Sequence, residues 1–502
     1  MKKSLFLTIL IALGAALPAA QTSSGVSDAD RDMLRIFHTI SSHDILDYAV
    51  KLSSEKYDGR PAGHPGYIEA ARWVAGRLAE WGIRPGGDDG TYFQWFDKPY
   101  VEILSPGGLS VHVPGRGGET LTVAYNFPGD YYPGYNSGSG TVSADVVFAG
   151  FGITAPELDY DDYKGVDVRG KIVLVDAGVP YAGKDPDEIT RWEPFSYHQH
   201  KLDNAARQGA SGLLYIGKAA NPNTSYNPGL IYVHPDMPVV DHLFFGTGKT
   251  YPAVKENIIK TRRPASFAMG KRATIDAETV FHPDRKTCNV IGILDGADPI
   301  LKNEVIIVGG HLDGIGTLAG LFMPGALDNA SGCVNILGAA RALAALPVRP
   351  ARSIMFLFIG AEESGLQGSI HYTRNPVFPS DKTVAFFNLD MVGTGTGLVI
   401  GGGQSFPGIL RHFETANSRF IHRDMRATEA RKPIGRPRSD GVIFSRAGFR
   451  TLSIGTMGTD KKIYYHDPLD TTDTLTPELM EDVAKWIFLA FAGMASDPDL
   501  DL

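Results

Sequence analysis

The sequence predicts an α/β fold in which a mostly parallel, mixed sheet is covered by helices and carries an inserted, mainly β module. Three observations support this prediction. From Cys288 onward, short apolar runs alternate with helical segments, and the runs lack the polar alternation of half-exposed strands. Between about 107 and 264, Gly, Pro, Tyr and Asn are frequent and short β-rich runs dominate. The chain has 502 residues, too many for one compact core, so two or three domains are expected.

Local patterns assign the elements of the first half. Helical spacing of apolar residues predicts helices within 27–53 and 66–82, and Gly82 ends the second of them. Strand-like sequence begins at Tyr92–Phe96. The inserted module is expected to contain three strands and a helix, namely Ala144–Phe148, Lys171–Val175, Gly212–Ile216 and the helical His200–Gln208.

The second half alternates strands and helices. A helix is predicted over 334–346, where Pro347 closes it, and a last helix has Thr476 as N-cap and Pro477 as its first residue. The predicted strands are Asn289–Leu294, Glu304–Val308, Ser353–Ile359, Thr383–Leu389, Leu398–Ile400 and Thr451–Ile454.

The first twenty residues have the pattern of an export signal. Lys2 and Lys3 precede a short apolar run, 5–17, and the small residues Ala19 and Ala20 follow it. The run is short for a membrane span, so a membrane anchor is the less favoured alternative. We expect export to the periplasm or the cell exterior, without stable membrane insertion.

Charge and cysteine content narrow the class of protein. The chain has 56 acidic and 48 basic residues and a net charge of −8, which argues against nucleic acid as a partner. Its two cysteines, Cys288 and Cys333, lie inside apolar segments. Buried free thiols are therefore favoured, although the sequence leaves a disulfide between them open.

Metal-competent side chains follow the predicted strands. Ligands in open α/β sheets bind beyond the carboxyl ends of the strands, which meet at one rim. Taken singly, each such residue has an ordinary explanation, such as a loop histidine, a solvated glutamate, a helix N-cap or a turn aspartate. Together they predict a metal site with five ligands: His311, Asp328, Glu363, Asp390 and His466.

The predicted donor set defines the metal. Two imidazoles and three carboxylates suit zinc, with cobalt or manganese as substitutes. Asp328 lies on a Gly-flanked loop, 325–332, and is the expected bridge between two ions. Asp313 is expected to accept the ring N–H of His311, although an exposed aspartate explains it as well.

The strings around these residues resemble peptidase family M28, the co-catalytic zinc exopeptidases of the bacterial leucyl aminopeptidase type. They are GGHLDG (309–314), GALDNASG (325–332), FIGAEESGLQGS (358–369), FNLDMVG (387–393) and YYHDPLDT (464–471). Residues 57–82, with DGRPAGH, are similar to the family's N-terminal region. The stretches 152–178 and 201–217 resemble a protease-associated domain.

The resemblance implies a domain plan. A signal peptide would occupy 1–20, and the peptidase domain would consist of 27–106 and the metal-binding 265–502. The protease-associated domain would occupy 107–264.

The resemblance also implies a mechanism. One zinc would take His311, Asp328 and Asp390, and the other would take Asp328, Glu363 and His466. Glu362 would be the general acid/base that serves a metal-bridging water. Two departures from the family pattern concern specificity more than chemistry. Ser439–Asp440–Gly441 stands where many relatives have Ser–Asp–His, and the segment 314–324 makes the connection from His311 to Asp328 longer than in the simplest members.

The leading functional prediction is aminopeptidase activity on peptide substrates. A carboxypeptidase or dipeptidase is the close alternative and would need a cation for the substrate carboxylate, which the seven basic residues of 419–438 keep open. A non-catalytic receptor or a one-zinc glutaminyl cyclase is less favoured. His198 and His200 are expected to be a surface pair rather than ligands. Side-chain preference and oligomeric state are not encoded in any pattern that we recognise.

Overall fold

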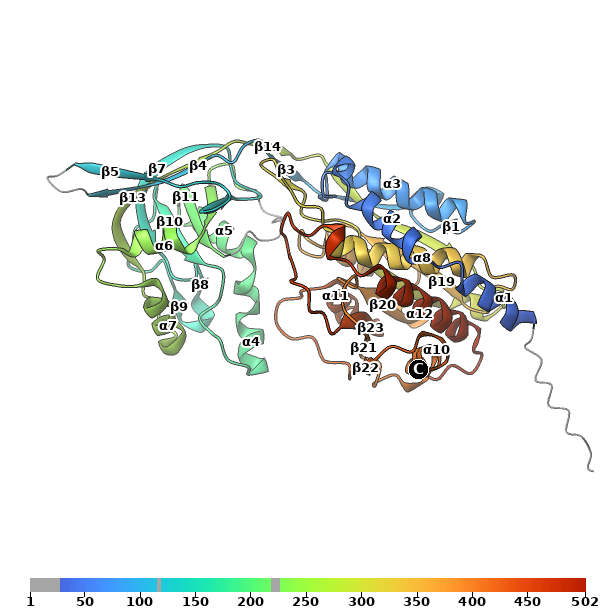
Figure 1. Cartoon of the computed structure of the whole chain (residues 1–502). Coiled ribbons are helices and arrows are strands. Elements are labelled where there is room, and N and C mark those ends of the chain that lie inside the picture. Colours follow the sequence, from blue (N-terminus) through green and yellow to red (C-terminus); the bar gives the residue numbers. More distant parts are fainter. Residues whose placement is uncertain (1–27, 115–118, 218–225) are drawn as a thin grey trace, which may run out of the picture.

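The computed structural model describes residues 28–114, 119–217 and 226–502, and the expected signal peptide lies outside this range. The described chain forms two large sheets, each with its own hydrophobic core and its own helices (Figure 1). The prediction of an α/β fold with a mixed sheet is confirmed.

The first sheet has nine strands in the described residues, in the order β1-β15-β19-β16-β20-β23-β21-β22, with β2 also on β15. Its four central strands, β19, β16, β20 and β23, are parallel. Every residue of β16, β19 and β20 is buried, as the absence of polar alternation predicts. The strands are β1 (Arg84–Pro85), β2 (Phe93–Asp97), β15 (Lys286–Leu294), β16 (Val305–His311), β19 (Ser353–Ile359), β20 (Thr383–Leu389), β21 (Gly397–Gly401), β22 (Met425–Ala427) and β23 (Thr451–Met457).

Helices cover both faces of this sheet. The core of one face contains residues of α1 (Asp28–Phe37), α2 (Ser42–Leu52), α3 (Pro65–Glu80), α8 (Ser331–Ala344), α10 (Pro407–Ala416) and α12 (Pro477–Ser496). The core of the other face contains residues of α9 (Gln367–Arg374) and α11 (Asp440–Arg446). Thr476 occupies the N-cap position of α12 as expected, but its side chain makes no capping hydrogen bond. Cys288 and Cys333 are both buried free thiols, as favoured.

The second sheet has eight strands in the described residues, in the order β5-β4-β13-β7-β10-β11-β12-β6. Four of them, β7, β10, β11 and β12, run parallel. The strands are β4 (Gly108–Pro114), β5 (Thr120–Ala124), β6 (Tyr131–Pro133), β7 (Gly140–Phe148), β10 (Ile172–Asp176), β11 (Gly212–Ile216), β12 (Ile231–Pro235) and β13 (Phe267–Ala277), and β8 (Thr154–Ala155) pairs with β9 (Tyr160–Asp161) beside them.

The second region contains more helix than the sequence predicts. Its described part has α4 (Pro186–Trp192), α5 (His198–Arg207), α6 (Met237–Phe244) and α7 (Tyr251–Thr261), of which only α5 is expected. The other three are 7, 8 and 11 residues long, which gives few repeats of a helical period. The description as mainly β is therefore incomplete.

The boundary at 264 also differs from the structure. Strand β13 extends the second sheet to Ala277 because it pairs with β7 and β4. Strands β3 (Tyr100–Ile103) and β14 (Thr279–His282) pair with each other where the chain passes between the two sheets. Among the described helices, none has both the length and the apolar character that a bilayer crossing requires.

Candidate metal centre

The five predicted ligands gather at the carboxyl ends of the parallel strands of the first sheet. His311 is the last residue of β16, and Asp390 directly follows β20. Glu363 lies in the turn after β19, and His466 lies in the loop after β23. Asp328 lies in a wide helical turn, Ala326–Ala330, immediately before α8. Segments that are up to 155 residues apart in the chain (466 minus 311) therefore meet at one rim.

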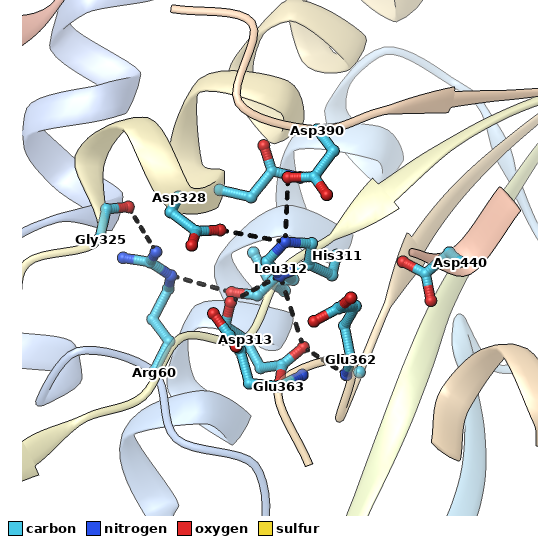
Figure 2. Close-up of polar contacts among 12 residues, drawn as sticks. Arg60, His311, Leu312, Asp313, Gly325, Asp328, Glu362, Glu363, Asp390 and Asp440 are labelled. Atoms are coloured by element: carbon cyan, nitrogen blue, oxygen red, sulfur yellow. Dashed lines mark hydrogen bonds and ion pairs between the residues drawn. The ribbon is translucent and has the colours of Figure 1, made fainter. Parts of the chain in front are cut away.

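The distances divide the ligands into two groups of three that share Asp328. His311 Nε2 lies 3.3 Å from Asp328 Oδ1 and 3.4 Å from Asp390 Oδ1. His466 Nε2 lies 3.1 Å from Glu363 Oε1 and 3.5 Å from Asp328 Oδ2. The two oxygens of Asp328 thus face different imidazoles, and Figure 2 shows the half of this arrangement around His311. This is the division of ligands that the sequence resemblance implies.

Two buried carboxylate oxygens at the centre have no hydrogen-bond donor in the described residues, Asp328 Oδ2 and Asp390 Oδ1. A buried charged oxygen without a donor is costly unless a cation is bound to it. Donor atoms of His311, Asp328 and Glu363 all lie within 4.8 Å of one another, close enough to hold one ion. Nitrogen and carboxylate ligands in this arrangement fit zinc.

The electrostatics of the imidazoles support a bound cation. Burial disfavours the charged form of His466, but Glu363 and Asp328 raise its pKa to about 10. Burial likewise opposes protonation of His311, yet Asp328 and Asp390 raise its pKa well above the ordinary value. The carboxylates therefore demand positive charge at this position, which a divalent ion supplies while it binds neutral imidazoles.

Asp313 orients His311 differently from the prediction. His311 Nδ1 lies 3.1 Å from the main-chain oxygen of Asp313 and 3.9 Å from its carboxylate. The carboxylate instead accepts the main-chain N–H groups of Glu362 and Glu363, at 3.0 and 3.1 Å. Asp313 therefore holds the imidazole through its carbonyl and the glutamate turn through its side chain.

Glu362 has the environment of a proton-transfer group. It is 8% exposed and lies beside the ligand cluster (Figure 2). Burial and the carboxylates of Glu363, Asp440 and Asp390 raise the pKa of Glu362 well above its ordinary value, against the effect of His311. A carboxyl group with a raised pKa can both accept and return a proton near neutral pH.

Arg60, the arginine of the motif DGRPAGH, supports the site but was not among the residues predicted from the sequence. It is fully buried, and its guanidinium donates to the main-chain oxygens of Leu52, Leu312, Pro324 and Gly325 at 2.6 to 3.0 Å. Leu312 follows His311, and Gly325 precedes Asp328 by three residues (Figure 2). Arg60 therefore fixes both ends of the segment that connects two ligands.

Two further carboxylates support the cluster. Asp470, from the YYHDPLDT string, accepts the main-chain N–H groups of Leu327 and Asp328 at 2.8 and 3.1 Å. Asp440, noted in the sequence only for the glycine after it, is 1% exposed and accepts the hydroxyl of Ser369 at 2.5 Å. Burial raises the pKa of Asp440 to about 6, although His311 opposes the shift.

The long segment 314–324 forms a small hairpin of β17 (Thr317–Leu318) and β18 (Leu321–Phe322). Ile315, Leu318 and Met323 pack against Tyr135, which comes from the second region. The segment between the ligands His311 and Asp328 therefore contacts the second region.

The remaining sequence candidates have other partners. In the basic segment, Arg423 pairs with Asp482 at 2.6 Å and Arg436 donates to the main-chain oxygen of Ser196 at 3.3 Å. His198 and His200 are partly buried rather than at the surface, and His198 contacts the hydroxyl of Tyr215. The expectation of a surface pair is therefore wrong.

Comparison with known proteins agrees with this site. Residues 289–491 match the model of peptidase family M28. An aminopeptidase of Pseudomonas aeruginosa is 27% identical over 341 residues, which is 67% of this chain and 54% of the relative. Aminopeptidase YwaD of Bacillus subtilis is 30% identical over 256 residues, 48% of this chain and 45% of the relative. The chain thus spans about half the length of these curated relatives.

The fold has solved counterparts. The aminopeptidase from Aneurinibacillus sp. strain AM-1 has 21% sequence identity and a TM-score of 0.59, with 91% of this chain and 95% of that chain covered. The match of residues 289–491 to a peptidase family model, together with the buried His and carboxylate cluster, places the site in the class of metal-dependent peptidases. Within this class, the region that carries the site, residues 289–491, matches the model of peptidase family M28. We therefore assign the buried group of His311, Asp328 and Glu363 as a zinc-binding site.

Proposed function

We propose that this protein is a dinuclear zinc aminopeptidase that removes N-terminal residues from peptides. The observation that carries the proposal is Asp328, whose two oxygens face two different imidazoles at 3.3 and 3.5 Å. A carboxylate that lies between two sets of imidazole and carboxylate ligands is placed to bridge two neighbouring ions. The names of the Pseudomonas and Bacillus relatives support the aminopeptidase assignment.

The residues of the chain divide the work of hydrolysis. Zinc bound at this site would polarise the scissile carbonyl and lower the pKa of a water molecule. Glu362, which is not among the five ligands, would take the proton of that water on its carboxylate and return it to the leaving amine. The carboxylate of Asp313 holds Glu362 in place by accepting the main-chain N–H of Glu362. The cluster of carboxylates also attracts the ammonium group of a free N-terminus.

Two arginines of the basic segment 419–438 have partners within the protein, which weakens the case that this segment makes the enzyme a carboxypeptidase. Arg423 and Arg436 of the basic segment are engaged with Asp482 and Ser196 and are not free for a substrate carboxylate. Arg60 is buried and donates to main-chain oxygens only.

We further propose that the protein is exported and that the second region acts as a protease-associated domain beside the active site. The charged and small-residue pattern of 1–20 supports export. The packing of Tyr135 against Ile315 and Leu318 supports a role for the second region at the active-site edge.

The test combines metal analysis with a peptide panel. Purified protein should contain close to two zinc ions per chain, and chelation should abolish hydrolysis until zinc is restored. Peptides with a free N-terminus should be cleaved from that end, while the N-acetylated forms should resist. Release of the C-terminal residue from an N-acetylated peptide would overturn the aminopeptidase assignment. One ion per chain in fully active enzyme would overturn the dinuclear site.

A further inference from the structure

A small cavity lies between the metal centre and the second region. Its volume is about 20 Å³, enough for one or two groups the size of a water molecule. Lys98, Tyr135, Ile315 and Ser364 are among the residues that line it. Ser364 directly follows the ligand Glu363 in the chain, so one wall of the cavity belongs to the glutamate turn of the metal centre.

Lys98 brings a buried cation with unused hydrogen-bond donors to this cavity. Its side chain is 4% exposed, and in the described residues its ammonium donates to one partner, the main-chain oxygen of Pro99 at 2.8 Å. An ammonium group has three donors. Burial lowers the pKa of Lys98 to about 8 against the charge of Asp313, so the group is mainly protonated at neutral pH. Arg60, another buried cation near the metal centre, instead donates to four main-chain oxygens.

Tyr135 brings an unpartnered hydroxyl to the same cavity. The residue is 7% exposed, and its hydroxyl has no hydrogen-bond partner among the described residues. Burial raises the pKa of Tyr135, and the charge of Glu363 raises it further, which keeps the hydroxyl protonated and able to donate. A buried donor that is left unpaired in the free protein is positioned for a ligand acceptor.

The chemistry of the cavity selects its ligand. A cation would be repelled by Lys98, and an apolar group would leave the ammonium and the Tyr135 hydroxyl unsatisfied. A carboxylate offers two acceptor oxygens and the opposite charge, and its hydrogen bonds to charged donors are strong. The apolar wall at Ile315 suits the carbon stem of such a group.

We propose that Lys98 and Tyr135 form a subsite for a carboxylate of the substrate, so that the enzyme favours peptides with an acidic group next to the scissile bond. This inference rests on the proposed peptidase function. The carboxylate can come from the side chain of an acidic N-terminal residue or from the free C-terminus of a dipeptide. Both sources present the same group to the cavity, and matched substrates separate them.

The experiment measures kcat/KM for two substrate pairs on the zinc enzyme. The first pair is Glu-p-nitroanilide and Gln-p-nitroanilide, which differ in the side-chain carboxylate. The second pair is Leu-Gly and Leu-Gly-amide, which differ in the terminal carboxylate. We expect the charged member of one pair to be preferred by about tenfold to hundredfold, as for a charged hydrogen bond. The pair that shows the preference identifies the source.

Variants then assign the preference to the cavity. Lys98→Met should abolish it and leave kcat/KM for the uncharged member within about twofold, while Tyr135→Phe should reduce it about threefold to tenfold. Lys164→Met, at an exposed lysine of the second region, is the matched control and should change neither. Thermal melting checks that each variant is folded. If Lys98→Met does not fold, Tyr135→Phe provides the test of the subsite.

The outcomes separate this inference from the proposed function. Equal rates within both pairs, or an equal loss for both members in Lys98→Met, would overturn the carboxylate subsite and leave a water-filled cavity. Cleavage of Leu-Gly-amide in that case would still support an aminopeptidase. Absence of hydrolysis of every substrate in the zinc-loaded enzyme would overturn the proposed function itself.

Discussion

Each of the two large sheets has a parallel strand that leads into an aspartate, and the two aspartates have different partners. Asp176 ends β10 in the second sheet, where Lys255 lies 2.8 Å away, Gly178 N–H donates at 2.7 Å and the Tyr251 hydroxyl also donates. Asp390 follows β20 in the first sheet, and its Oδ1 has no donor among the described residues. The first carboxylate is paired with a lysine and accepts hydrogen bonds, while the second has only the His311 imidazole at 3.4 Å and can bind a cation.

The same contrast holds for the groups around each aspartate. In the second region, buried Asp162 accepts main-chain N–H groups of Phe151 and Ile153 at 2.9 and 3.1 Å and the hydroxyl of Tyr160. In the first sheet, Asp328 has an oxygen without a donor and faces two imidazoles instead. A carboxylate at a strand end is therefore weak evidence for a metal site, and the supply of donors around it decides the matter.

The largest expected effect concerns a carboxylate that binds no metal. Glu362→Gln should lower kcat by about 10²-fold to 10⁴-fold, because an amide cannot take the proton of the attacking water. The zinc content should stay unchanged, because Glu362 is outside the ligand set. Steady-state kinetics and elemental analysis check both parts. Glu157→Gln, at an exposed glutamate of the second region, is the control, and a near-normal rate in Glu362→Gln would remove Glu362 from proton transfer.

The next effect sets the two strand-end aspartates against each other. Asp176→Asn should lower the free energy of unfolding by about 1–3 kcal/mol, because it breaks a paired buried charge, and should leave zinc binding unchanged. Asp390→Asn should weaken zinc binding, because it removes a predicted ligand, and should destabilise the metal-free protein less than Asp176→Asn, because the Asp390 carboxylate has only the His311 imidazole beside it, at 3.4 Å.

Denaturant unfolding of metal-free protein and zinc titration measure these two quantities in both variants. A loss of stability in Asp390→Asn as large as that in Asp176→Asn would contradict the contrast between the two sheets.

A smaller effect is expected for the arginine that connects two ligands. Arg60→Lys keeps the charge but loses the planar fork that reaches four main-chain oxygens. We expect zinc affinity to fall by about tenfold to hundredfold, as for other residues that orient metal ligands. Competition with a chelator measures this affinity. Arg84→Lys, at an exposed pair with Asp295, is the control, and unchanged affinity in Arg60→Lys would reduce Arg60 to a structural role.

The strands and the ligands were predictable because each depends on one local pattern. A buried apolar run predicts a parallel strand, and the polar residue after it must lie at the shared rim. His311 and Asp390 could therefore be predicted to lie at this rim, and the structure places both there. Short helices such as α6 were missed because eight residues contain little more than two turns.

Contacts between distant segments were not predictable. Arg60, Lys98 and Tyr135 reach the site from turns and strand ends that precede it by more than 170 residues (311 minus 135 for the last of them). A basic or aromatic residue in such a segment has no periodic signal. For Asp313, both the carbonyl and the carboxylate lie near His311, at 3.1 and 3.9 Å, and a two-residue spacing cannot choose between them.

The smallest effect concerns acid stability and the second sheet. Burial lowers the pKa of His234 to about 4, and burial together with the charges of Arg436, His234 and Lys201 lowers the pKa of His198 to about 3. Both values lie below the ordinary value of about 6.5, so between pH 6.5 and about 4 the unfolded chain binds protons that the folded protein does not. Stability should therefore fall as the pH falls through this window.

From pH 6.5 to 5, each of the two histidines should remove up to about 2 kcal/mol of unfolding free energy. Urea unfolding at both pH values, followed by tryptophan fluorescence, to which Trp192 of the second region contributes, measures the loss. His234→Gln should flatten the pH dependence, because glutamine does not titrate, whereas His43→Gln at an exposed site should leave it unchanged. If the unfolding free energy of wild type and of His234→Gln depends equally on pH, the His234 imidazole is not held neutral by its surroundings. The second sheet would then lack the acid sensitivity that distinguishes it from the sheet with the metal centre.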